Sequence, residues 1–128
     1  MSLANDLKKF AKLSIEKQDR VVRSSFIQLG NEMEFKSPVD KGFFKSAWIG
    51  GIGNPVDFVS IDSGRDAVGS LHAMLGGFKV GQVFYYTNSM PYALKLEYGH
   101  SDQAPGGIVR LTARRWNKIV NEQIRANQ

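Results

Sequence analysis

The longest periodic stretch of the chain is LANDLKKFAKLSIEKQDRVVRSSFIQLGNEME, residues 3–34, in which apolar side chains recur every three or four positions. This spacing places them along one face of a helix, so the sequence predicts a single amphipathic helix over 3–34. At 1.5 Å per residue the helix would be about 48 Å long, too long for a domain of this size. We therefore expect it to bend near Ser24-Ser25 or Gly30, or to pack one end on a neighbouring subunit. The Ser-Pro pair at 37–38 ends it, because the residue before proline avoids helical conformation.

A second long helix is predicted at the other end of the chain, over Ile108 to Arg125. Its apolar stripe contains Val109, Ala113, Trp116, Val120 and Ile124. Basic side chains, at intervals of four residues, lie on a different face: Arg110, Arg114 and Lys118. Because Trp48 and Trp116 each lie in an apolar periodic segment, we expect both to be buried in the core.

The middle of the chain is richer in β-prone residues. Bulky residues over 43–52 and 56–61 flank a Gly-Asn-Pro turn and predict a hairpin, while alternation over 78–87 predicts another strand. Between them, Ser63 and Asp66 form a capping-box pattern before a short helix that ends at Gly76-Gly77. The fold class predicted is therefore α+β: a small, mostly antiparallel sheet packed against a long N-terminal helix and a C-terminal helix.

Composition limits the class of protein. With 128 residues, 42% of them hydrophobic and 23% charged, we expect one globular domain over 1–128. No apolar run is long enough to span a bilayer, and the first residues lack a signal-peptide pattern, so we expect a protein that stays in the cytoplasm. There are no cysteines, which excludes disulfides and thiolate chemistry. The net charge is +5, and residues 7–25 and 108–128 carry the excess, which favours a polyanionic neighbour.

No catalytic, cofactor or metal site is predicted. His100, Ser101 and Asp102 include the residue types of a hydrolase triad, but three consecutive residues cannot converge as nucleophile, base and orienting group. Glu97 with His100 and Asp102 is thin evidence for a metal site, because one loop supplies a single histidine. The glycine clusters lack the continuation of a phosphate-binding or dinucleotide-binding loop. The aromatic run at 84–86 is better explained as a packed sheet face than as a base-stacking platform.

The segment from Pro91 to Arg110 reads PYALKLEYGHSDQAPGGIVR. Proline suits the first turn of a helix, so a short helix is expected up to Tyr98, and Gly99 then ends it. The polar run that follows, His100 to Gln103, belongs on the surface between two anchored helices. A loop held in this way is suited to recognition.

Together with Ser-Pro-Val-Asp-Lys-Gly at 37–42, this segment resembles the neck or tail-completion proteins of long-tailed bacteriophages. The first motif maps onto Pro38, Asp40 and Gly42. The second maps onto Pro91, Tyr92, Ala93, Leu96, Glu97, Gly99, His100, Ser101, Gln103, Ala104, Pro105, Gly107 and Arg110. Lys41 stands where the family pattern has threonine, and Ile108 where it has methionine.

The resemblance implies a virion structural protein of the neck that completes the tail end and joins tail to head, as a six-membered ring around the DNA channel. The implied partners are further copies of the chain, tail terminator or tail tube proteins and head-completion or portal-side proteins, with transient contact to genomic DNA and none to a membrane. Such a protein assembles in the host cytoplasm and needs no cofactor. The residues expected to bind partners are Glu97, His100, Ser101, Asp102, Gln103, Arg110, Arg114 and Lys118.

Two alternatives remain open at the level of sequence. One is a tail terminator protein, whose position in the virion is adjacent. The other is a basic accessory protein that binds nucleic acid through phosphate contacts, with the surface formed by Lys8, Lys9, Lys12, Arg110, Arg114 and Lys118.

Overall fold

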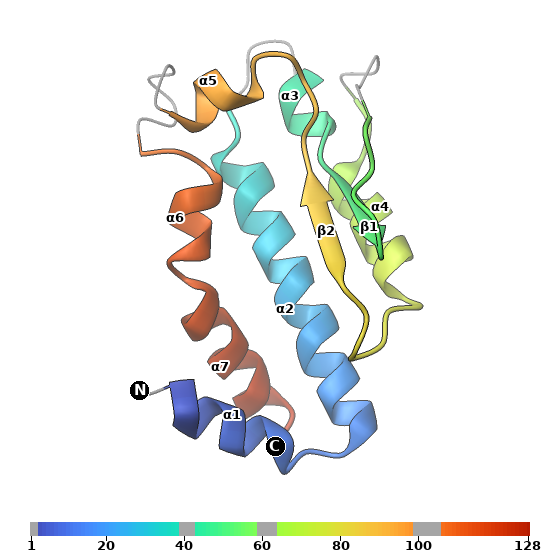
Figure 1. Cartoon of the computed structure of the whole chain (residues 1–128), viewed down its shortest axis with the longest axis vertical. Helices are drawn as coiled ribbons and strands as arrows, with labels where there is room; N and C mark the ends of the chain where they lie inside the picture. Colours follow the sequence, from blue (N-terminus) through green and yellow to red (C-terminus); the bar gives the residue numbers. More distant parts are fainter. Residues whose placement is uncertain (1–2, 39–42, 59–63, 99–105) are drawn as a thin grey trace.

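A computed structural model describes residues 3–38, 43–58, 64–98 and 106–128 of the chain. The elements, in chain order, are α1 (Leu3–Ala11), α2 (Ile15–Lys36), α3 (Phe43–Ser46), β1 (Ile49–Ile52), α4 (Ala67–Leu75), β2 (Phe84–Thr87), α5 (Ala93–Glu97), α6 (Val109–Ala113) and α7 (Trp116–Ala126). Helix α2 is the central element, with α6 and α7 along one side and the β1–β2 sheet with α4 along the other (Figure 1). The predicted α+β class is confirmed, with long helix α2 and C-terminal helix α7 packed around a small antiparallel sheet.

The prediction of one unbroken helix over 3–34 was wrong. Helix α1 ends at Ala11, and the side-chain oxygen of Ser14 accepts a hydrogen bond from the Lys17 amide at 3.3 Å and caps α2. A serine cap of this kind favours a new helix start over continuation of the preceding one. The break lets α1 cross the end of the molecule and pack on α7 (Figure 1).

The two positions at which a bend was expected remain inside α2. The Ser25 hydroxyl donates to the Val21 carbonyl at 2.7 Å, so its polar group is satisfied within the helix. At Gly30 the side chain of Leu71 in α4 lies close to α2, because a Cβ there would lie 2.2 Å from Cδ2 of Leu71. The missing side chain at Gly30 therefore serves packing between α2 and α4, and the helix continues through it.

The predicted hairpin between 43–52 and 56–61 was also wrong. Residues Phe43–Ser46 form the short helix α3, and β1 pairs with β2, far along the chain, in a register that sets Ile49 opposite Thr87. Residues 56–58 contain no strand, although Thr87 Oγ1 donates to the Val56 carbonyl at 2.8 Å, and 59–61 lie outside the described residues. The strand predicted over 78–87 is confined to its last four residues.

The short helix predicted after Asp66 is confirmed as α4. Its N-cap is Asp66 itself, whose carboxylate accepts from the Gly69 amide at 2.8 Å. The predicted partner in the capping box, Ser63, lies outside the described residues.

The core contains two clusters of buried side chains that are joined by a shared neighbour. One contains Met33, Phe44, Trp48, Ala67 and Ile108, and the other contains Leu71, Leu75 and Phe78. Tyr86 of β2 packs against both clusters and so links them. Burial of Trp48, which is only 4% exposed, is confirmed, and its indole nitrogen donates to Ser37 Oγ at 2.8 Å.

Five aromatic rings stack in series across the molecule. Trp116 of α7 lies on Phe26 of α2, with ring centroids 5.6 Å apart, and Phe26 lies on Phe84 of β2 at 4.5 Å. Phe84 continues to Tyr86 at 6.0 Å, and Tyr86 to Trp48 at 5.3 Å. The stack therefore couples α7, α2 and the sheet. Trp116, at its end, is half-buried, so the prediction of full burial was wrong for this residue.

The C-terminal helix predicted over 108–125 is divided into α6 and α7. At the junction, the Arg115 amide donates to the Thr112 carbonyl at 3.0 Å in a tight turn, and the Arg115 side chain forms an ion pair with Glu32 of α2 at 2.7 Å. The break redirects the chain so that α7 follows α2 and Trp116 reaches Phe26 (Figure 1).

Candidate partner-binding surface

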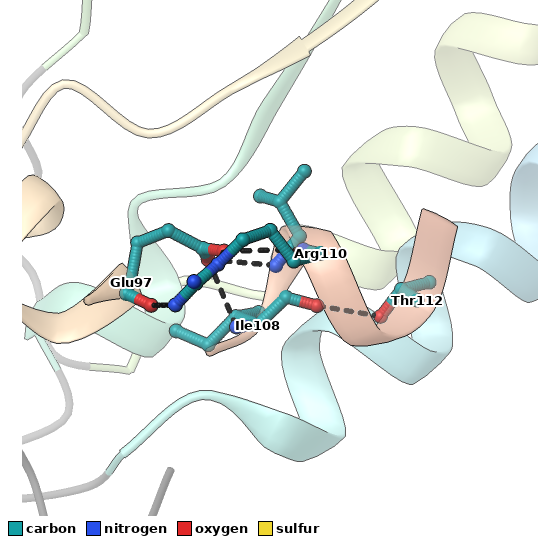
Figure 2. A network of polar contacts seen from close by, with 5 residues as sticks. Glu97, Ile108, Arg110 and Thr112 are labelled. Atoms are coloured by element: carbon teal, nitrogen blue, oxygen red, sulfur yellow. Dashed lines mark hydrogen bonds and ion pairs between the residues drawn. The ribbon is translucent and has the colours of Figure 1, made fainter. Parts of the chain in front are cut away.

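The carboxylate of Glu97 is the centre of a polar network that joins α5 to α6. Its Oε1 accepts hydrogen bonds from the amides of Ile108 at 2.8 Å and Val109 at 2.7 Å, and its Oε2 accepts from the Arg110 amide at 3.1 Å (Figure 2). These amides belong to the first turn of α6 and have no partner within the helix. Glu97 thus caps α6 from a distance, in place of a local capping residue.

Arg110 closes the network from the other side. Its Nε pairs with Glu97 Oε2 at 3.0 Å, and its Nη2 donates to the Glu97 backbone carbonyl. Figure 2 shows the guanidinium folded back over Glu97. The same guanidinium lies over the ring of Tyr98, 4.9 Å from its centroid, in a cation–π contact. We name Glu97, Tyr98, Gly107 and Arg110 the clasp.

Gly107 belongs to the clasp because only glycine fits there. Its φ is +91°, in the left-handed region, and a Cβ would lie 2.7 Å from the Glu97 carbonyl oxygen. The close approach of Gly107 to Glu97 brings together the two described ends that flank residues 99–105. The clasp therefore fixes the ends of the segment that carries the predicted recognition residues.

The pKa of Glu97 reflects this environment. Burial raises the pKa of the carboxyl group, but hydrogen bonds from the amides of Val109, Ile108 and Arg110 and from the Arg110 side chain outweigh burial and lower it. Hydrogen bonds to the charged form favour ionisation. Glu97 is therefore a structural carboxylate, held ionised by the clasp.

Beside the clasp, helix α5 exposes large apolar side chains to solvent. Leu94 is 73% exposed and Tyr98 is 65% exposed, and their spacing of four residues places them on the same face of α5. Tyr92 before α5 and Val109 in α6 are also exposed. We name Leu94 and Tyr98 the α5 face. Two other side chains of this segment contact the core: the Tyr92 ring centroid lies 6.0 Å from that of Phe44, and Leu96 packs against the same cluster.

The predicted partner-binding residues divide into three groups. Glu97 and Arg110 meet in the clasp, where they bind each other. Arg114 and Lys118 are exposed, and the break between α6 and α7 removes the continuous helix on which a single stripe with Arg110 depended. The remaining four, His100 to Gln103, lie outside the described residues.

Sequence reasoning missed the long-range cap that Glu97 provides for α6. The signal in the sequence was the spacing of Glu97, Gly107 and Arg110. Nothing local links these three positions. It also missed the exposed Phe35 of α2, which is 86% exposed and borders a groove with Glu32 and Arg115.

A second buried polar group, the phenol of Tyr86, lies in the core near Trp48. Burial and the nearby Glu34 carboxylate raise the pKa of Tyr86 far above its ordinary value, despite an opposing effect of Arg65. Burial likewise raises the pKa of Glu34, although Lys45 opposes this. The Tyr86 phenol therefore stays protonated at neutral pH and acts as a core aromatic.

Within the described ranges, no three His, Cys, Asp or Glu side chains gather closely enough to hold a metal ion. The described helices include none with the length and apolar character needed to cross a membrane. No protein-family model matches the chain, and neither the curated proteins nor the solved structures provide a significant match to it.

Proposed function

We propose that the chain is a structural protein of the bacteriophage neck, which completes the tail end and joins tail to head as a ring around the DNA channel. The observation that carries the proposal is the clasp. Three of its residues, Glu97, Gly107 and Arg110, are motif positions of the resemblance, and their contacts join α5 to α6.

The chemistry of the surface favours docking over catalysis. Both charged groups of the clasp are engaged in hydrogen bonds with each other and with backbone, so their role is to position the chain. The adjacent α5 face offers apolar area, and burial of such area stabilises a complex by about 25 cal/mol per Å². The exposed Tyr98 is of a type enriched among the residues that dominate protein interfaces, and Leu94 adds apolar area beside it.

Arg114 and Lys118 supply a second contact in this proposal. Both are exposed, near the start of α7, and an acidic surface on the next protein of the neck would match their charge. Phosphates of DNA in the lumen are the other candidate. Tight phosphate binding would hold back the genome during ejection, so a protein contact is favoured.

The proposal is tested by Leu94→Asp in an in vitro assembly assay that joins separately purified heads and tails. Because aspartate is costly to desolvate, we expect the variant to lose most of the joining activity while its melting temperature stays close to that of the wild type. Val83→Asp is the matched control, since Val83 is also exposed but lies away from α5. Joining that is equally efficient with Leu94→Asp and wild type would refute a role for the α5 face.

Light scattering and filter binding separate the proposal from the nucleic-acid alternative. We expect a ring, or a complex with neck proteins, that binds duplex DNA weakly. A monomer that binds duplex DNA with a steep salt dependence would favour the basic accessory protein instead.

A further inference from the structure

A cavity of about 170 Å³ lies where α1 crosses α2 and α7. Its wall is mostly apolar and includes Leu7, Phe10, Val22, Trp116, Val120 and Ile124. The crossing of α1 over the end of α7 places this space at the opposite end of the molecule's long axis from α5 (Figure 1). Cavities of roughly this size in other proteins hold a single aromatic ring.

The unusual member of the cavity wall is Asp6. This residue is only 5% exposed, and its Oδ1 accepts no hydrogen bond from the part of the chain that the structure describes. The Ser25 hydroxyl, which also lines the cavity, donates instead to the Val21 carbonyl. A buried carboxylate is costly unless a donor or a cation satisfies it. Asp6 therefore supplies the cavity with an acceptor that a bound ligand can use.

We propose that this cavity binds a small organic cation, a primary ammonium group on a short aromatic or aliphatic stem. The ammonium group would donate a charge-assisted hydrogen bond to Asp6 Oδ1. Phe10 and the indole of Trp116 would contact the stem, and aromatic faces also attract the adjacent positive charge. The volume limits the stem to about the size of a benzyl group. This inference does not depend on the proposed role in the phage neck.

The cavity selects this class over neutral and anionic ligands for electrostatic reasons. A neutral aromatic of the same shape would fill the apolar space but leave the carboxylate unsatisfied. An anion would meet the carboxylate in a poorly solvated space and be repelled. A cation without an apolar stem would lose the contacts with Phe10 and Trp116.

The test is a calorimetric titration of the full chain with benzylammonium, compared with benzyl alcohol as the neutral analogue. We expect benzylammonium to bind roughly 10- to 100-fold more tightly than the alcohol, because both can donate a hydrogen bond to the Asp6 carboxylate but only the ammonium group carries the opposite charge. Asp6→Asn should remove this preference. Asp57→Asn, at an exposed aspartate, is the matched control and should leave it unchanged.

Nuclear magnetic resonance locates the site independently of affinity. On addition of benzylammonium, the indole N–H signal of Trp116 should shift while that of Trp48, in the other part of the core, should not. Val120→Phe, which fills the cavity, should abolish the shift in a protein that retains its circular dichroism spectrum.

Three results would overturn the proposal. They are equal affinity for amine and alcohol, unchanged preference in Asp6→Asn, and a shift confined to Trp48. A fourth concerns the source of the ammonium group. If a lysine-containing peptide binds at Trp116 and free benzylammonium does not, the cavity receives a protein side chain and the assignment to a small molecule is wrong.

Discussion

Removal of the Glu97 carboxylate is the most direct test of the clasp. In Glu97→Gln the side chain keeps its shape but loses its charge, and one of its two acceptor oxygens is replaced by an NH2 group, which cannot accept from the backbone and guanidinium donors around it. We expect the first turn of α6 to lose its cap and the contact between α5 and α6 to weaken. The rest of the core, which is built on α2, α4 and the sheet, should remain folded.

The magnitude follows from the contacts. Loss of a helix cap costs about 1 kcal/mol. The remaining hydrogen bonds to the carboxylate are worth about 1 kcal/mol more. The ion pair itself adds at most a few tenths, because the Arg110 side chain is 49% exposed and solvent screens it. The sum, about 2 kcal/mol, corresponds to a fall of roughly 8 °C in melting temperature for a chain of this length.

The pH dependence of the free energy of unfolding distinguishes loss of this carboxylate from a simple packing defect. Because the folded state lowers the pKa of Glu97, its stabilising effect is complete above the unfolded value near 4.5 and is lost as pH falls through the lower folded value. The stability difference between wild type and Glu97→Gln should therefore be largest near pH 7 and shrink in acid, as measured by thermal unfolding from pH 7 to pH 2.

Glu122→Gln, at an exposed glutamate of α7, is the control and should unfold like the wild type at every pH. A melting temperature for Glu97→Gln within about 1 °C of the wild type at pH 7 would refute the cap. So would a difference that stays constant down to pH 2.

The remaining predictions concern the other parts of the fold and surface. Gly107→Ala should cost about 2 kcal/mol in urea unfolding, because of its positive φ and the contact with the Glu97 carbonyl; a neutral effect would contradict the clasp geometry. Trp48→Ala should cost about 3 to 5 kcal/mol, and Trp116→Ala less, since the second indole is half-buried; equal costs would contradict this order. Reversal of Arg114 and Lys118 to glutamate should abolish head–tail joining with an unchanged circular dichroism spectrum. Normal joining with altered DNA ejection would instead place both side chains in the channel.

Local signals in the sequence predicted the elements whose stability is local. The helical period predicted α2 and α7 approximately, and the capping-box pattern at Ser63 and Asp66 predicted a helix at α4, although its N-cap is Asp66. Predictions failed where the deciding contact is distant in sequence. The partner of β1 is β2, although a turn signal suggested the nearer segment 56–61, and only tertiary packing decides between them.

The breaks in the two terminal helices were not predicted, for a similar reason. Ser14 is a good cap but is also tolerated inside a helix, so the choice depends on whether α1 can pack on α7. At the surface, the sequence singled out both Glu97 and Arg110 but assigned them to partners. Their mutual contact spans 13 residues and depends on the backbone freedom of Gly107, which no periodicity indicates.

The series of stacked rings from Trp116 to Trp48 gives the protein a built-in optical signal. The two tryptophans of the chain lie at the two ends of this series. The aromatic rings of α7, α2 and the sheet are therefore held at fixed separations and angles. Rings held rigidly in an asymmetric environment produce strong near-ultraviolet circular dichroism, which is lost when packing loosens while helices persist. A single unlabelled spectrum can therefore report whether α7 remains docked on α2 during assembly.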